Sequence, residues 1–371
     1  MSRPQIIVNV STALTRRGDA TDTGTAFVAY AGATGPTDPV VVYSEADAVD
    51  AGVPAGTAAL IGDALTEGCP QVVVVRAVAV DAAAVTHAEW AVGLGKFGSG
   101  YGAGQLLIPG VTSAAAHAAL VAAAAAQGRV ALLDGGAANA TATALATTAT
   151  GLTAADESFR VNVLAPWVSV PAAGGGTRDV PPSIFTAALA ARGDARVGHT
   201  NHAPAGTHGN GAGVIGKGTG VSKVFTDAEL DTLHDAGVSV IKMVDGKPTL
   251  YGWVSVSDEA ALRQFNVGRT VMMLGLGIRT LAEKFLFRQI DGRGHLYAEF
   301  DGALRAYLLP LWAQDALYGA TADDAFDVEV ASVNSPATAA DGELHAAVDA
   351  ALTQHTEKIT INVVTTTPEG A

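Results

Sequence analysis

The sequence has a single cysteine, Cys69, among its 371 residues. No disulfide can therefore form within one chain, which excludes the disulfide-stapled designs of small secreted proteins. Long apolar runs are also missing. The longest, residues 118–126, is too short and too rich in alanine to span a bilayer, and the first ten residues hold no apolar stretch of signal-peptide length. We expect a protein made in the cytoplasm, with no direct membrane insertion.

Charge is scarce as well, and positive charge most of all. Charged residues make up 16% of the chain and the net charge is −14, whereas about 25% is typical of soluble domains. This balance argues against nucleic acid as a partner, because nucleic-acid binders present Lys and Arg to phosphates. Much of the exterior must be Ala, Gly, Thr and Ser, a surface that loses its hydration at low cost. An alanine-rich coding bias would produce the same composition.

Each end of the chain carries a β-prone segment with no neighbouring strand. Residues 5–10 precede a polar stretch that runs to residue 22, and residues 358–367 alternate apolar and polar side chains before a run of threonines. An unpaired strand edge invites pairing with another chain, so we predict strand exchange between copies of the protein. The apolar side chains of the two segments are Ile6, Ile7, Val8, Val10, Ile359, Ile361 and Val363.

Residues 23–247 alternate short β-rich runs with alanine-rich helical windows, the order that builds a sheet covered by helices. The predicted strands are residues 25–31, 40–43, 72–80, 105–108, 130–134 and 168–171. The predicted helices are residues 45–49, 57–67, 113–127, 137–150 and 182–192. Some strands are apolar throughout, which is typical of burial on both faces. We therefore predict a layered α/β main domain.

Residues 248–357 have a different pattern, which predicts a small α+β domain. An apolar stripe with spacings of three and four predicts a helix over residues 266–289; its members are Val271, Leu274, Ile278, Leu281 and Phe285. A second helix is expected over residues 302–317, bent at Pro310. Strands are expected at residues 326–330 and 357–364. So few strands leave this domain short of sheet partners.

One glycine-rich string imitates a nucleotide site. Residues 211–217 match the first seven positions of a P-loop, in which backbone amides and a lysine surround phosphate oxygens. However, Gly218 stands where Ser or Thr should bind Mg²⁺, and no strand precedes the loop. A P-loop-like nucleotide-dependent enzyme is the alternative that this string leaves open.

Two other residue sets imitate active sites. Asp22, Ser113 and His208 are the residue types of a Ser–His–Asp triad, but their chain order and neighbours do not fit, and Ser113 suits the N-cap of the helix that follows it. His199, His202 and His208 could bind zinc, yet no Cys, Asp or Glu in that stretch completes a ligand set. We predict no catalytic centre, no cofactor and no metal.

Basic residues gather in one region of this acidic chain. Residues 262–293 contain six of them and two acidic ones: Arg263, Arg269, Arg279, Lys284, Arg288 and Arg293, with Glu283 and Asp291. The apolar stripe buries one side of the predicted helix, so the basic side chains project elsewhere. They form either a solvated face, where Glu283 pairs locally, or a docking surface for an acidic partner.

A series of segments resembles, in the same order, the sheath proteins of contractile tails, a family shared by contractile-tailed phages, R-type bacteriocins and extracellular contractile injection systems. Trp167 and Pro181-Pro182-Ser183 are the most distinctive elements. The matching segments are residues 24–42, 64–77, 105–111, 129–134, 165–170, 179–194, 202–206, 228–242, 262–270 and 304–330.

The resemblance implies a structural subunit without enzymatic activity. Such subunits polymerise as stacked hexameric rings around an inner tail tube in a metastable extended state, and contract to drive the tube through a target cell envelope. Baseplate and tail terminator proteins would bind the ends of the sheath, in a virion tail or contractile particle assembled in the cytoplasm of a bacterial host. A self-assembling tail or shell protein that does not contract is the second alternative.

The resemblance also implies a domain plan. The main domain would have a subtilisin-like sheet topology, and the C-terminal inner domain, residues 248–357, would be completed by strands that neighbouring subunits donate. Residues 1–22 and 358–371 would be the donating arms. A helix of the C-terminal domain would touch the tube; the basic residues expected at this contact are Arg269, Arg279, Lys284 and Arg288.

Overall fold

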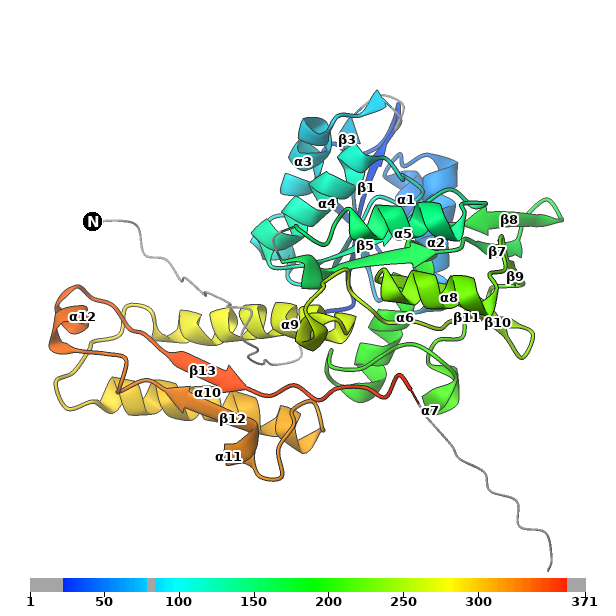
Figure 1. The fold of residues 1–371 in the computed structure, drawn as a ribbon. Helices are drawn as coiled ribbons and strands as arrows, with labels where there is room; N and C mark the ends of the chain where they lie inside the picture. Colours follow the sequence, from blue (N-terminus) through cyan, green and yellow to red (C-terminus); the bar gives the residue numbers. More distant parts are fainter. Residues whose placement is uncertain (1–22, 79–83, 156, 359–371) are drawn as a thin grey trace, which may run out of the picture.

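The computed structural model describes residues 23–78, 84–155 and 157–358. A rounded α/β body carries an elongated C-terminal unit on one side (Figure 1). None of the helices in this described part combines enough length with enough apolar character to span a bilayer. The predicted strand-exchange residues lie outside the described ranges; they are Ile6, Ile7, Val8, Val10, Ile359, Ile361 and Val363.

An eight-stranded sheet forms the centre of the body. Its strands, in order across the sheet, are β11 (Lys247–Leu250), β10 (Val238–Val244), β6 (Val161–Ala165), β5 (Val130–Asp134), β4 (Gln105–Leu107), β1 (Ala26–Ala31), β3 (Val72–Val78) and β2 (Val40–Val42). The six inner strands run parallel, while β2 and β11 pair antiparallel at the two edges. The sheet therefore has the mixed, mainly parallel order of a layered α/β fold.

Helices cover both faces of this sheet. One face packs against α1 (Glu45–Asp50), α2 (Ala55–Glu67) and α6 (Pro182–Val197). The other packs against α3 (His87–Gly95), α4 (Ala114–Gln127), α5 (Ala142–Thr150) and α8 (Asp227–Asp235). Alternate residues of β3 face the two layers, with Val72 and Val74 in the first and Val73 and Val75 in the second.

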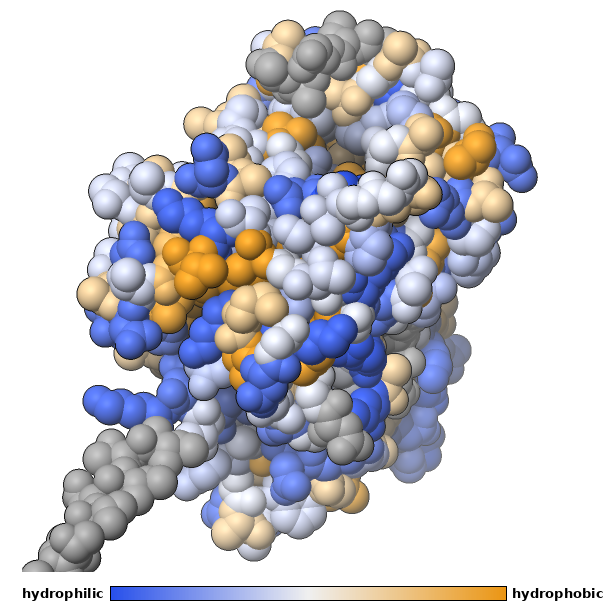
Figure 2. All heavy atoms as spheres, turned by 90° about the vertical axis from the view of Figure 1, so that its right-hand side faces the viewer, coloured by the Kyte–Doolittle hydropathy of each residue, from blue (hydrophilic) through white to orange (hydrophobic). Residues whose placement is uncertain are grey.

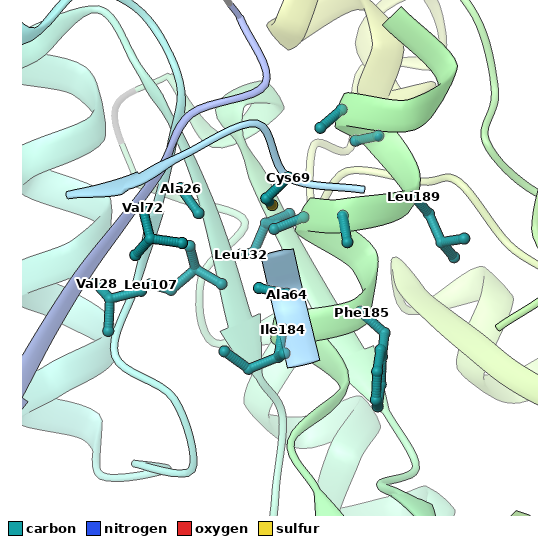
Figure 3. Packing of buried hydrophobic residues seen from close by; sticks show 14 of the residues in the cluster. Ala26, Val28, Ala64, Cys69, Val72, Leu107, Leu132, Ile184, Phe185 and Leu189 are labelled. Atoms are coloured by element: carbon teal, nitrogen blue, oxygen red, sulfur yellow. The ribbon is translucent and has the colours of Figure 1, made fainter. Parts of the chain in front are cut away.

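Figure 3 shows the first layer, where strand side chains such as Val72 and Leu107 lie opposite Ile184 of α6. Both sides of the interface are apolar, which explains why the strands of this sheet are apolar throughout. On the other side of the sheet, Ser113 caps α4 by accepting a hydrogen bond from the Ala116 amide at 3.3 Å, so the predicted N-cap is confirmed.

A small three-stranded sheet extends from the body. It has the order β8 (Thr177–Val180), β7 (Val168–Pro171) and β9 (Gly220–Val221), and the β7–β8 hairpin points away from the body in Figure 1. On the face that carries these strands, weakly polar and apolar atoms lie between the hydrophilic ones (Figure 2). This mixture matches the low charge content of the sequence. The short helix α7 (His208–Gly211) lies in the loop that precedes β9.

The C-terminal unit is a helical hairpin with a strand pair beside it (Figure 1). Its elements are α9 (Phe265–Ala282), a 3-10 turn (Glu283–Phe285), α10 (His295–Ala313), α11 (Ala322–Ala325), β12 (Phe326–Glu329), α12 (Pro336–Ala340) and β13 (Ala347–Ala350). Strands β12 and β13 are antiparallel, with Phe326 opposite Ala350. The unit has its own apolar core, which the predicted stripe of α9 joins through Val271 and Ile278.

The elements predicted from sequence between residues 23 and 330 are present, but several boundaries were wrong. Helix α10 begins at His295 instead of 302, because Gly302 is tolerated inside it. Helix α9 ends at Ala282 instead of 289, since the chain turns back before α10. Helix α5 begins at Ala142 instead of 137, where Thr141 caps it.

Other elements were missed altogether: α3, α7, α8, α11, α12, β6, β8, β9, β10, β11 and β13. Of the predicted strand at residues 357–364, the two residues within the described ranges are not in a strand, and the rest lies outside those ranges.

Candidate functional site

A buried carboxylate lies where the body meets the C-terminal unit. Asp194, near the end of α6, accepts two hydrogen bonds from Arg269 of α9, Nη1 to Oδ1 at 2.9 Å and Nη2 to Oδ2 at 2.6 Å. The Thr23 hydroxyl donates to Oδ2 at 2.6 Å. The Nε2 atom of His202 lies 2.7 Å from Oδ1. One carboxylate thus connects α6, α9, the loop after α6 and the first described residue of the chain.

Electrostatics explain why this group can stay charged inside the protein. Burial by itself raises the pKa of Asp194, but the Arg269 guanidinium and the His202 ring outweigh it and hold the pKa at about 2. Burial lowers the pKa of His202, and the hydrogen bond to Asp194 opposes that shift. At neutral pH the carboxylate and the guanidinium therefore form a charged pair with its hydrogen bonds in place.

This geometry corrects the sequence-based expectation for Arg269. Its side chain is 0% exposed, because the body and the C-terminal unit enclose it. A guanidinium enclosed by its own subunit is not on a surface that a tube could touch. Arg269 is instead a connecting residue between the two parts of the subunit.

The predicted histidine set does not converge on one point. His202 binds Asp194, whereas His199 Nε2 lies 3.1 Å from the Gln314 carbonyl and His208 Nε2 lies 3.1 Å from the Ala203 carbonyl. Within the described ranges, no group of three His, Cys, Asp or Glu residues is arranged to hold a metal ion. His199 and His202 join elements of the subunit to one another.

A second set of contacts at the junction holds the segment that leads to the C-terminal arm. The Gln264 side chain donates to the His355 carbonyl and accepts from the His355 amide, each at 2.8 Å. The Asn201 amide group donates to the carbonyls of Ala316 at 2.6 Å and Thr353 at 3.2 Å. Residues 353–355 are therefore fixed to α9 and to the loop after α6. No role was predicted from sequence for Asp194, Asn201 or Gln264, although Asp194 and Gln264 lie in two of the segments that resemble sheath proteins.

The P-loop-like segment, residues 211–217, binds a carboxylate of the same chain, that of Glu67. The Glu67 carboxylate accepts hydrogen bonds from the amides of Gly216 at 2.7 Å and Lys217 at 3.2 Å. The Lys217 ammonium binds Asp63 at 2.6 Å. Arg192 and Arg178 complete the cluster, on Glu67 at 3.0 Å and Asp63 at 2.6 Å respectively. A side chain of α2 thus occupies the place where a nucleotide phosphate would have to lie.

The other three expected tube contacts lie at the end of α9 and in the connection to α10. Arg279, Lys284 and Arg288 are exposed. Arg288 forms an ion pair with Glu299 of α10 at 2.6 Å, so part of its charge is already balanced. No ion pair involves Arg279 or Lys284 within the part of the chain that the structure describes. Among the expected tube contacts, these two side chains carry the positive charge that no described ion pair balances.

Two solved structures of contracted sheaths are similar to this chain over nearly its whole length. The helical sheath of the anti-feeding prophage in its contracted state has a TM-score of 0.72 and 19% identity, and covers 98% of this chain and 99% of its own. The PVC sheath complex of an extracellular contractile injection system, also contracted, has a TM-score of 0.74 and 16% identity, with 98% of both chains covered.

A sheath tail protein from Desulfitobacterium hafniense has a TM-score of 0.57 and 12% identity, with 87% of this chain and 93% of that chain covered. No protein-family model and no curated protein matches the sequence. The chain therefore has the fold of contractile sheath proteins, as the sequence resemblance predicted.

Proposed function

We propose that this chain, which has the sheath fold, is a structural subunit of a contractile sheath. It polymerises as stacked hexameric rings around an inner tail tube, is held in a metastable extended state, and contracts to drive the tube through a target cell envelope. One observation carries the proposal: contracted sheaths of two different particles align with 98% of the chain. The subunit belongs to a tail or contractile particle, with a baseplate and a terminator protein at the ends of the sheath.

The C-terminal unit supports the predicted exchange of strands. Its described sheet consists of β12 and β13 alone, and two-stranded sheets are marginally stable by themselves. Strands from residues 1–22 and 358–371 of neighbouring copies would complete it. Each added backbone hydrogen bond contributes roughly 0.5–1.5 kcal/mol, so an arm that forms about four would stabilise the contact between two subunits by a few kcal/mol.

The finer fold assignment, a subtilisin-like topology of the main sheet, is part of this proposal.

The bases of both arms are fixed, which is what force transmission requires. Thr23, next to residues 1–22, donates to Asp194. His355, three residues before the C-terminal arm, is held by Gln264. A pull on either arm would therefore act on the junction between the body and the C-terminal unit. Contacts that join one face of a subunit to a different face of the next subunit build an open helical filament when the rotation between subunits does not close a ring. If the interfaces between subunits have two stable packings, the filament can have two lengths.

The surface charge supports a second proposed contact, between the C-terminal unit and the inner tube. We assign Arg279, Lys284 and Arg288 to the inner tube, because they are exposed and form the positive patch of an acidic protein. Arg269 is left out of this contact because it is buried. The nucleotide-dependent alternative loses its support, since the Gly216 amide and the Lys217 ammonium, which would bind phosphate, already bind Glu67 and Asp63.

Two measurements test the proposal. Negative-stain microscopy of the purified full-length protein should show rings or tubes, and a stable monomer at high concentration would contradict it. Removal of residues 358–371 should leave a subunit with unchanged circular dichroism and melting temperature that no longer forms tubes, because both hydrogen bonds between His355 and Gln264 remain. Normal assembly of that truncation would contradict the arm model. A polymer that exists in only one length would favour the non-contractile alternative.

A further inference from the structure

The turn between α9 and α10 presents an exposed aromatic side chain. Phe287 is 86% exposed, although phenylalanine is among the residues that folding buries most strongly. Its backbone is left-handed, with φ at 63°, a conformation that bulky residues rarely adopt. Exposed aromatics in unusual backbone conformations are frequent at binding sites. Phe287 is therefore a candidate anchor for a partner.

Contacts of the neighbouring residues order the backbone of the connection that carries Phe287. Arg288 forms the ion pair with Glu299 and lies 5.3 Å from the Phe285 ring centre. Further along, the Asp291 carboxylate accepts hydrogen bonds from the amides of Arg293, His295 and Leu296 at 2.9, 3.2 and 3.0 Å. An ordered backbone loses little conformational freedom when its side chain binds.

The opposite end of the same unit has an open cavity of about 770 Å³. Leu317, Tyr318 and Ala351 provide its apolar lining, and Asp315 and Asp324 lie at the same cavity. Tyr318 is 71% exposed, so this apolar surface also has no cover within the described chain. The lining residues between 315 and 320 come directly after α10 in the chain, and Phe287 comes eight residues before it. Helix α10, with its 19 residues, is about 28 Å long and lies between the two in the chain.

We propose that Phe287 of one copy inserts into this cavity of the next copy. The two surfaces complement each other in shape, because a protruding aromatic ring meets an open apolar cavity. They also complement each other in charge, since the connection between α9 and α10 that carries Phe287 also carries the exposed Arg293, and Asp315 lines the cavity. One copy cannot fill its own cavity across the length of α10. The contact is therefore head-to-tail and joins C-terminal units into a ring or a filament.

This inference rests on the proposed assembly of copies and specifies one of its contacts. A pair of engineered cysteines tests it directly, because the native Cys69 is buried. In the variant with Phe287→Cys and Tyr318→Cys, oxidation of assembled protein should yield a ladder of covalent multimers. Either single variant should yield at most dimers. A control pair, Phe287→Cys with Val92→Cys on the exposed face of α3, should yield no ladder.

Charge exchange provides a second test that needs no tube protein. Arg293→Asp should raise the concentration for half-assembly at least tenfold, and adding Asp315→Arg should restore it. Phe287→Leu should assemble far better than Phe287→Glu. Assembly of the unsubstituted chain without a ladder in the Phe287→Cys, Tyr318→Cys variant would overturn this contact and leave the sheath proposal standing. An unsubstituted chain that never assembles would overturn both.

Discussion

The Asp194 carboxylate and the Arg269 guanidinium form a two-point ion pair inside the subunit, at 2.9 and 2.6 Å. The pair joins α6 of the body to α9 of the C-terminal unit. Two parallel hydrogen bonds define an orientation as well as a distance, so the pair aligns the two helices. Burial makes it sensitive to the loss of either partner, because the remaining charge would be left without compensation.

Replacing Arg269 with methionine should destabilise the subunit by about 3–5 kcal/mol, since Asp194 would be left as a buried, unpaired charge. Urea unfolding monitored by circular dichroism measures this loss. Arg279→Met is the matched control on the same helix and should stay within about 0.5 kcal/mol of the unsubstituted protein. The double variant Asp194→Asn, Arg269→Met should recover part of the loss. Equal stability of the Arg269→Met and Arg279→Met proteins would refute the role of the pair.

Asp194 should also make the subunit sensitive to acid. Its pKa is about 2 in the folded protein and about 3.9 when unfolded, so the unfolded chain binds more protons between these values. The stabilisation, about 2–3 kcal/mol, is present above pH 5 and is lost as the pH falls toward 2. Unfolding free energies of the unsubstituted and Asp194→Asn proteins, measured from pH 7 to pH 3, should therefore converge as the pH falls. A constant difference would contradict this.

Asp134 should act in the opposite direction. Burial raises its pKa to about 6, although the amides of Gly110 and Ser183 and the Ser183 hydroxyl donate to it. The folded protein then binds the proton more tightly than the unfolded chain does. Its contribution is present below about pH 4 and is lost as the pH rises through 6. Relative to Asp134→Asn, the unsubstituted protein should lose stability between pH 4.5 and pH 7.5, by roughly 2–3 kcal/mol.

Removing the Glu67 carboxylate should expose the anion site of the P-loop-like segment. In Glu67→Ala, the amides of Gly216 and Lys217 lose their acceptor, which should cost about 1–3 kcal/mol. Millimolar phosphate should raise the melting temperature of this variant by binding the freed groups, and should leave the unsubstituted protein unchanged. ATP with Mg²⁺ that stabilises the unsubstituted protein would instead revive the nucleotide-dependent alternative.

Neutralising the exposed cations should weaken docking to the tube without unfolding the subunit. Arg279→Met and Lys284→Met should each reduce co-sedimentation with purified tube protein about two- to fivefold, because exposed pairs contribute roughly 0.2–1 kcal/mol. The loss should shrink at high salt. Arg288→Met should have a smaller effect, since Glu299 already balances its charge. Unchanged co-sedimentation of the Arg279→Met, Lys284→Met double variant would remove these residues from the contact.

Much of the fold could be predicted wherever the pattern was local and strong. The apolar strands β3 and β5, the Ser113 cap of α4 and the stripe of α9 follow from neighbouring residues alone. Strand β10 and its partner β11 were missed although a signal was present. Asp245-Gly246 joins them with φ of 47° and 76°, and an Asp-Gly pair between β-rich runs is a strong hairpin signal.

The candidate sites were harder to predict because their residues are distant in sequence. Arg269 is separated from Asp194 by 75 residues, and Glu67 from Gly216 by 149. The basic cluster looked uniform in sequence, yet Arg269 is buried, Arg288 is paired, and only Arg279 and Lys284 of the four expected tube contacts are exposed without an ion pair in the described chain. Burial depends on how the helices pack, and residue order does not reveal it.

The sequence by itself determined the layered α/β architecture, the helical C-terminal unit and the resemblance to contractile sheaths, because periodicity and segment order are properties of neighbouring residues. Only the tertiary structure decided that Glu67 binds the amides of the P-loop-like segment and that Asp194 connects the body to the C-terminal unit. It also decided that Phe287 is exposed and that an open cavity follows α10. Whether a charge is paired and whether an aromatic ring is exposed depend on which distant residues folding brings together.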